Sequence, residues 1–140
     1  MRVIAGGAKG RTLFAPIGAA TRPTSDLVRG AVLNMLAAAG ADFSRALDLY
    51  AGSGAMGIEV LSRGEGTCDF VEREPRGCEA IRRNLRLAGV EGRARVLCMP
   101  AREALGKLPG PYSLILADPP YADSDARLLL SSWATAGRID

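Results

Sequence analysis

Histidine is absent from this 140-residue sequence. This absence excludes mechanisms that use imidazole as a general base or as a metal ligand. Cysteine is scarce, and Cys68, Cys78 and Cys98 form no C-x-x-C pair. Their scattered places in apolar segments are typical of buried free thiols, with a catalytic thiol as the other interpretation. We therefore expect no metal, and chemistry that relies on carboxylates, backbone groups and binding geometry.

Long apolar runs are also missing. No segment approaches the length needed to span a bilayer, and residues 1–11 lack the apolar stretch of a signal peptide. We expect no membrane partner and a cytoplasmic location. The net charge of +3 is compatible with nucleic acid without requiring it. With 48% apolar and 24% charged residues, the chain has the composition of one soluble globular domain.

From residue 45 onwards the sequence repeats the order strand, turn, helix. Apolar runs predict strands at 46–49, 67–72, 94–99 and 112–121, separated by segments with helical spacing, and one more helix begins near Ser124. Strands that alternate with helices imply parallel pairing. The predicted fold class is therefore α/β, a Rossmann-like, doubly wound parallel sheet.

The first residues form a separate predicted unit, a β-hairpin arm at 1–20, followed by the main domain at 21–140. Two short strands, 2–5 and 12–14, are joined by a glycine-rich turn that carries basic side chains. These charges are either simply solvated or touch the phosphates of a nucleic acid.

A helix is predicted from Asp26 to about residue 38, with Thr24 or Ser25 as its N-cap, because Val28, Val32, Met35 and Leu36 recur at helical spacing. Asn34 lies between two apolar residues of this helix, which suggests a buried or site-facing role. A later helix, 75–88, carries arginines opposite its apolar stripe, and such a charge run is usually a solvated face.

A glycine-rich turn joins the first strand of the repeated pattern to its helix. Gly52, Gly54 and Gly57 have the G-x-G-x-x-G spacing of a nucleotide-binding loop, whose helix N-terminus offers free N–H groups. Glu72 ends the next strand, twenty residues beyond Gly52, where a carboxylate can accept ribose hydroxyls. Many such loops are only turns, but strand, loop, helix, strand and acid in this order predict a ligand that contains adenosine.

The fourth predicted strand ends in Asp118, Pro119, Pro120 and Tyr121. The two prolines fix the backbone and contribute no N–H, so the turn is rich in acceptors. Such a turn suits a planar group with an exocyclic NH2, held by the Asp118 carboxylate and the Pro119 carbonyl while Tyr121 stacks on the ring. This arrangement would aim the nitrogen lone pair at an electrophile on the glycine loop. The other interpretation is a tight turn that merely ends a strand.

Several segments resemble a known family. LDLYAGSGAMGIEVLSRG (47–64), FVERE (70–74) and LADPPY (116–121) resemble motifs of class I S-adenosylmethionine-dependent methyltransferases that modify amino groups. MRVIAGGAKGRTLFAP (1–16) and TRPTSDLVRGAVLNML (21–36) more specifically resemble the RsmD family, whose members methylate N2 of a guanine in 16S ribosomal RNA. The resemblance covers essentially the whole chain.

This resemblance implies a Rossmann-like class I methyltransferase fold, S-adenosylmethionine as cofactor, and 16S ribosomal RNA or a 30S subunit as partner. It assigns the methionine and adenosine part of the cofactor to Asp48, Ala51, Gly52, Ser53, Gly54 and Gly57, and the ribose to Glu72. It assigns the target guanine amine to Asp118, Pro119, Pro120 and Tyr121. Near the substrate mouth it places Arg22, Thr24, Asp26 and Asn34.

The sequence departs from the family pattern in two places. Such proteins often carry Asp or Asn after the third strand to help place the adenine, whereas this chain has Met99-Pro100-Ala101, where the Ala101 N–H could still reach it. Class I sheets also usually have three further strands after the D-P-P-Y strand. Because this chain lacks them, we expect about half a sheet with an exposed edge, and a monomer unless that edge pairs with another chain.

Three hypotheses for the function remain open. The first is methyl transfer from S-adenosylmethionine to N2 of a guanine in small-subunit ribosomal RNA, by direct in-line attack of the amine. The second is a catalytically weak fragment that binds S-adenosylmethionine, because the lost strands leave the fold marginal. The third is an amino-methyltransferase with another target, such as adenine N6 in DNA. A dinucleotide oxidoreductase shares the glycine loop but gives no reason for D-P-P-Y.

Overall fold

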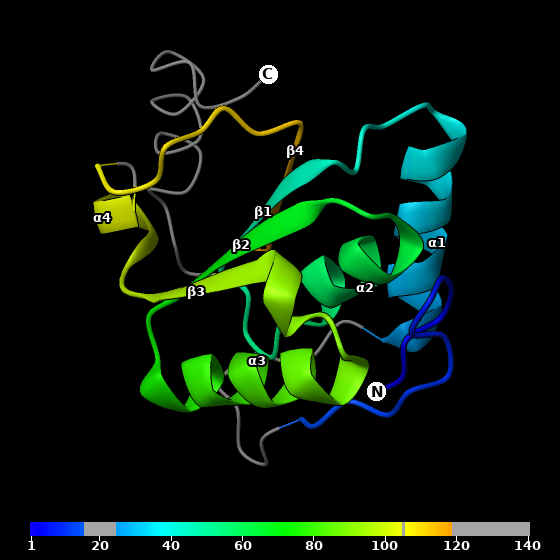
Figure 1. Ribbon diagram of the computed structural model, residues 1–140, viewed down its shortest axis with the longest axis horizontal. Helices are drawn as coiled ribbons and strands as arrows, with labels where there is room; N and C mark the ends of the chain where they lie inside the picture. The colour runs from blue at the N-terminus through cyan, green and yellow to red at the C-terminus, as the bar shows by residue number, and fades with distance from the viewer. Residues whose placement is uncertain (16–24, 105, 119–140) are drawn as a thin grey trace.

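The computed structural model describes residues 1–15, 25–104 and 106–118, and its centre is a four-stranded parallel sheet (Figure 1). The strands lie in the order β3-β2-β1-β4 and comprise β1 (Arg45–Leu49), β2 (Thr67–Glu72), β3 (Ala94–Cys98) and β4 (Leu114–Ala117). The helices are α1 (Asp26–Ala38), α2 (Ala55–Arg63), α3 (Pro75–Ala88) and α4 (Ala101–Ala104), with a 3-10 turn, η1, at Glu91–Arg93. The predicted α/β, Rossmann-like fold is confirmed.

Two hydrophobic layers cover the two faces of the sheet. Successive strand residues point to opposite faces, so Ala46 and Phe70 pack with α1, α2, α3 and the N-terminal hairpin. Leu47, Leu49 and Val71 pack on the other face, against α4 and the segment that follows it. The carboxyl edge of the sheet lies between these layers. In the described residues, no helix has the length and apolar content to cross a membrane.

Helix α1 forms where the sequence predicts it, but a different face is buried. Its N-cap is Ser25, whose Oγ accepts the Val28 N–H at 3.2 Å. The residues that pack inward are Arg29, Gly30 and Leu33, whereas Leu27 is 83% exposed and the side chains of Val28, Val32 and Met35 also face outward. Gly30 lies on the inner face against Ile4, where a Cβ would meet the Ile4 side chain at 3.4 Å, an ordinary van der Waals contact. The apolar spacing therefore predicted the helix correctly but not its orientation.

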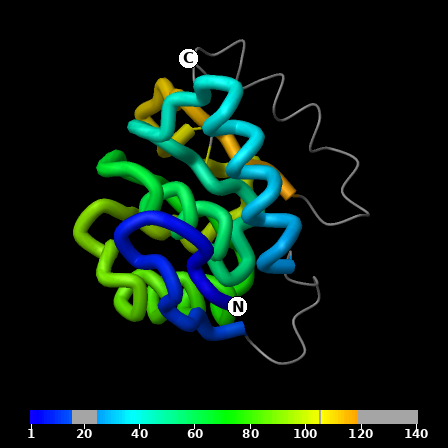
Figure 2. Tube along the Cα trace, turned by 90° about the vertical axis from the view of Figure 1, so that its right-hand side faces the viewer, coloured from blue at the N-terminus to red at the C-terminus, as the bar shows by residue number. Residues whose placement is uncertain are grey.

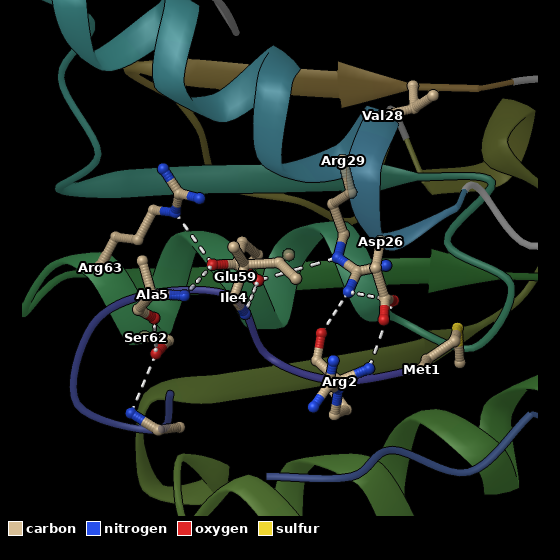
Figure 3. A network of polar contacts seen from close by, with 12 residues as sticks. Met1, Arg2, Ile4, Ala5, Asp26, Val28, Arg29, Glu59, Ser62 and Arg63 are labelled. Atoms are coloured by element: carbon tan, nitrogen blue, oxygen red, sulfur yellow. Dashed lines mark hydrogen bonds and ion pairs between the residues drawn. The ribbon is translucent and has the colours of Figure 1, made fainter. Parts of the chain in front are cut away.

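The N-terminal hairpin is pinned to α2 through polar contacts (Figure 3). The fully buried Glu59 carboxylate accepts the backbone N–H groups of Ile4 and Ala5 at 2.8 and 3.0 Å. Ser62 Oγ accepts the Ala8 N–H at 3.0 Å and donates to the Ala5 carbonyl. A Cβ at Gly6 would lie 1.8 Å from the Ser62 carbonyl oxygen, so only glycine permits this approach.

The same docking explains why the hairpin is less regular than predicted. The strands expected at 2–5 and 12–14 meet in one isolated antiparallel bridge, between Arg2 and Thr12. Val3 still bonds across the hairpin with Arg11 and Gly10, whereas the Ile4 and Ala5 N–H groups donate to Glu59. The hairpin is thus anchored to α2 beyond this short pairing, and Figure 2 shows it lying along the helical layer.

Two of the three cysteines are not the free thiols that the sequence suggests. Cys68 is buried and free, whereas Cys78 and Cys98 form a disulfide with Cα atoms 5.9 Å apart. The pairing arises because the first turn of α3 packs over the end of β3. Another predicted feature, the helix that begins near Ser124, lies outside the described residues.

Candidate active site

Three acidic residues gather at the carboxyl edge of the sheet. Asp48 is the fourth residue of β1, Glu72 is the last residue of β2, and Asp118 directly follows β4. In parallel sheets this edge is where ligands bind, because all strands end there and their loops are free to form a crevice. The candidate site is built around these three carboxyl groups and the loop after β1.

The loop after β1 has an unusual backbone. Gly52 and Gly54 have φ angles of +58° and +82°, in the left-handed region that favours glycine, and Tyr50 shares this region with a φ of +57°. A non-glycine residue there costs roughly 1–3 kcal/mol, and such strain is typical of ligand-binding loops. A Cβ at Gly52 would meet nothing within 4 Å, so the space beside its backbone is open.

Gly57 lets α2 approach the sheet closely. A Cβ there would lie 2.4 Å from the Phe70 ring and 3.0 Å from Cys68 Sγ. Its N–H donates to Asp48 Oδ2 at 3.0 Å, so Gly57 faces the core and supports Asp48. The third glycine of the motif is thus a packing residue that fixes the first turn of α2.

Asp48 is buried in an environment that disfavours its charge. Burial raises the pKa of Asp48 to about 8, although the hydrogen bond from the Gly57 N–H acts in the opposite direction. The negative charges of Glu72 and Asp118 raise this pKa further. Asp48 therefore binds a proton at neutral pH and can donate a hydrogen bond as well as accept one.

Glu72 is fixed at the mouth of the glycine loop. One carboxylate oxygen accepts the Gly52 N–H at 2.9 Å and the other accepts the Glu74 N–H at 2.8 Å. The side chain lies against α3 at Gly77, where a Cβ would be 2.7 Å from Glu72 Cγ. Gly77 thus leaves the space that the acid occupies, and Glu72 is held beside the open backbone of Gly52.

Asn84, on α3, is a residue of this region that sequence reasoning missed. Its fully buried amide donates to the Ser53 carbonyl at 2.9 Å and to the Phe14 carbonyl at 2.8 Å, and it accepts the Phe14 N–H at 2.6 Å. It therefore ties the glycine loop to the N-terminal hairpin. The available signal was a polar residue between Ile81 and Leu85 on the apolar stripe of the helix.

The remaining predicted residues fall into separate places. Ala51 donates its N–H to the Val71 carbonyl at 3.0 Å, and Ala101 is buried at the start of α4, so both border the carboxyl edge. Asp26 binds the hairpin, because its Oδ1 accepts hydrogen bonds from the Arg2 N–H and from Arg29. Asn34 is exposed and is not brought to this edge.

Asn34, on α1, contacts the end of α2 that is far from the glycine loop. Its Oδ1 accepts a hydrogen bond from Arg63 Nη1 at 2.7 Å, and Arg63 is the last residue of α2, at the end opposite the glycine loop. The other residues predicted for the site or its mouth, Arg22, Thr24, Pro119, Pro120 and Tyr121, lie outside the described residues. In the part of the chain that is described, no group of three or more His, Cys, Asp or Glu side chains could hold a metal ion.

A parallel sheet with a glycine loop after β1 and an acid after β2 defines the class, a Rossmann-like fold of the class I methyltransferase type. Among solved structures, the Escherichia coli protein yhhF superposes with a TM-score of 0.85 at 29% identity, over 100% of this chain and 75% of that chain. The family described as "Conserved hypothetical protein 95" matches residues 1–139. The chain belongs to this family, the RsmD family.

Two relatives show how much of the family's length the chain spans. It is 40% identical to YlbH of Bacillus subtilis (strain 168) over 134 residues, which are 94% of this chain and 72% of that protein. It is 35% identical to the ribosomal RNA small subunit methyltransferase D of Escherichia coli (strain K12), over 86% of this chain and 60% of that protein.

Proposed function

We propose that the chain binds S-adenosylmethionine at the carboxyl edge of its sheet and transfers the methyl group to the exocyclic N2 amine of a guanine in 16S ribosomal RNA. The name of the Escherichia coli relative supports the RNA target. The observation that carries the cofactor assignment is Glu72, held beside the open backbone of Gly52. Because this RNA belongs to the small ribosomal subunit, the protein would act in the cytoplasm.

The donors and acceptors at this edge fit such a cofactor. A carboxylate has about four lone-pair sites, and backbone N–H groups use two of those on Glu72, so two remain for the hydroxyls of a ribose. The open space beside Gly52 admits a ligand against the backbone. We assign the rest of the cofactor surface to Asp48, Ala51, Ser53, Gly54 and Ala101, with Gly57 supporting it through its hydrogen bond to Asp48.

We assign the target amine to Asp118, Pro119, Pro120 and Tyr121. When bound, S-adenosylmethionine supplies an electrophilic methyl group on its sulfonium. In this proposal the Asp118 carboxylate accepts one N–H of the guanine amine. Holding the amine at a fixed distance and angle supplies the rate, because orientation replaces an encounter in solution. No imidazole is required.

The decisive experiment is methyl transfer by the purified chain. Radiolabelled S-adenosylmethionine is incubated with 30S subunits that lack the modification, and the labelled nucleotide is identified after nuclease digestion. We expect label in N2-methylguanosine of 16S ribosomal RNA. Label in N6-methyladenine of a DNA substrate would replace the RNA target with DNA. Binding of S-adenosylhomocysteine without any transfer would leave a cofactor-binding fragment.

A further inference from the structure

The outer side of α3 carries arginines that no described residue neutralises. Arg76, Arg82, Arg83 and Arg86 are exposed, and Glu79 is the one acidic residue of the helix, so four positive charges stand against one negative charge. Within residues 1–15, 25–104 and 106–118, none of the four arginines forms an ion pair. This side of the protein is strongly basic.

Four arginines elsewhere in the described residues have structural partners. Arg29 and Arg63 both contact the buried Glu59 carboxylate, Arg93 donates to three backbone carbonyls, and Arg95 makes two hydrogen bonds to a carboxylate of β2. Those guanidinium groups hold elements of the fold together. Of the α3 arginines, Arg83 contacts the Phe14 ring, and the other three have no such contact among the described residues, which indicates that their charge has another use.

The arrangement on α3 also opposes helix stability. Arg82 and Arg86 are four residues apart and Arg83 and Arg86 are three apart, so like charges are neighbours on the helix surface. Arg76 lies in the first turn, where the helix dipole disfavours a positive charge. Glu79 offsets part of this repulsion, because Arg82 and Arg83 lie three and four residues beyond it, and a bound polyanion would relieve the rest.

The hairpin extends this basic surface. Arg11 Nη1 donates to the Leu87 carbonyl near the end of α3 at 3.1 Å, and the Arg83 guanidinium lies over the Phe14 ring, 4.1 Å from its centroid. Asn84 fixes the Phe14 backbone through two hydrogen bonds. Hairpin and helix therefore lie side by side as one rigid surface (Figure 2). We call it the arginine face, made of Arg11, Arg76, Arg82, Arg83 and Arg86.

We propose that the arginine face binds the phosphate backbone of RNA. The inference rests on the proposed function, and it names where the RNA is held outside the candidate active site. Residues 76 and 86 are ten positions apart, about 15 Å along the helix, which is long enough for several phosphates. On α3 the face starts at Arg76, four residues after Glu72, beside the carboxyl edge of the sheet. RNA that follows α3 is thereby led toward the edge where Asp118 lies.

Phosphate contacts of this kind position an RNA without selecting its sequence. The contact between Arg83 and Phe14 orders one guanidinium before binding, so less side-chain entropy is lost when a phosphate arrives. Affinity should fall steeply with salt, because each neutralised phosphate releases counterions.

The test compares two double variants of the full chain that lose the same charge. Arg82→Gln with Arg86→Gln removes two charges from the arginine face. Arg102→Gln with Lys107→Gln removes two exposed charges in and after α4, on the opposite face of the sheet. Affinity for unmodified 16S ribosomal RNA is measured across salt concentrations, together with thermal unfolding and affinity for S-adenosylhomocysteine. A third variant, Arg82→Lys with Arg86→Lys, keeps the charge.

We expect the α3 glutamine pair to weaken RNA binding at least about tenfold and to reduce the salt slope by about 1.4 to 1.8. The α4 pair should change affinity less than about twofold, the lysine pair should bind nearly as wild type, and S-adenosylhomocysteine should bind all of them equally. Equal RNA binding by the two glutamine pairs would overturn the proposal, since binding would then follow net charge alone. Absence of RNA binding by the wild type would overturn it as well.

The same preparations separate this proposal from the proposed function. Methyl transfer to 16S ribosomal RNA together with equal RNA binding by the two glutamine pairs would refute the role of the arginine face and support the proposed function. RNA binding that depends on the α3 arginines, without any methyl transfer, would refute the proposed function and support the role of the arginine face.

Discussion

The carboxylates at the two ends of the parallel sheet have different kinds of hydrogen-bond partner. At the amino end, Asp69 accepts two hydrogen bonds from Arg95, at 2.9 and 2.7 Å, and one from Tyr112 Oη at 2.7 Å. At the carboxyl end, Asp48 and Glu72 accept only backbone N–H groups, and neither forms an ion pair with a described arginine or lysine.

The pKa shifts express the same contrast. At the amino end, the hydrogen bond with Asp69 raises the pKa of Arg95, and burial followed by the contact with Asp69 raises the pKa of Tyr112, so each donor keeps its proton. At the carboxyl end, burial and neighbouring carboxylates raise the pKa of Asp48 to about 8. The carboxylate at the amino end has its side-chain donors within the protein, whereas the carboxylates at the carboxyl end are suited to hydrogen-bond donors of a ligand.

The largest expected effect belongs to Asp118→Ala. We expect methyl transfer to fall by about 1000-fold, because the carboxylate that orients the amine is lost, while affinity for S-adenosylhomocysteine stays within about twofold. Single-turnover transfer and isothermal titration measure the two quantities. Asp42→Ala, which removes an exposed acid before β1, serves as the control and should transfer normally. Normal turnover by Asp118→Ala would remove the amine-orienting role.

A second expectation concerns pH and Asp48. Its pKa is about 8 in the folded chain against a value of 3.8 without the fold, so the folded state binds more protons between these pH values. The stabilising contribution of the neutral form is complete below pH 3.8 and is lost as pH rises through 8. Between about pH 5 and 8 we expect wild type to lose of the order of a few kcal/mol relative to Asp48→Asn. Urea unfolding at both pH values tests this, and parallel stability curves would contradict it.

Glu72→Gln should weaken binding of S-adenosylhomocysteine by about 10- to 100-fold, because hydrogen bonds to a charged acceptor are worth about 1.5–3 kcal/mol. Asp69→Asn makes the same chemical change at the amino end and should leave this affinity unaltered. Titration of both folded variants sharpens the comparison between the two ends. Equal losses would show that the effect reaches the cofactor through the sheet, not through contact.

The smallest effect is expected for Tyr112→Phe. Loss of the hydrogen bond to Asp69 should lower the free energy of unfolding by about 1 kcal/mol, with methyl transfer and cofactor affinity unchanged. Denaturant unfolding gives the first quantity and the assays above give the others. A loss of cofactor affinity in this variant would mean that the two ends are not independent.

Much of the fold could be predicted because it depends on local pattern. The bounds of β2 are those predicted, Thr67 to Glu72, since a run of apolar and β-branched residues there is flanked by turns. The glycine loop was recognisable because strained backbone demands glycine. Even the approach of Glu72 to Gly52 followed from their spacing in a strand–loop–helix–strand unit.

What the sequence did not reveal depends on distant partners. Glu59 and Asn84 are polar residues on apolar helix faces, and their role is visible only once the hairpin, 54–70 residues away, is docked on them. The contact of Asn34 with Arg63, on another helix, was likewise not visible in the sequence. Periodicity gives the face that a residue occupies but does not identify its partner.

The docking of the hairpin sets an order of events during synthesis. The first residues leave the ribosome before their anchors exist, because Glu59, Ser62 and Asn84 follow 54–70 positions later. At about 5–20 residues per second, the hairpin waits roughly 3–14 s for its anchors. The beginning of the chain is thus fixed only after α2 has been made, and a nascent chain that ends before α2 keeps its beginning accessible to proteases and chaperones.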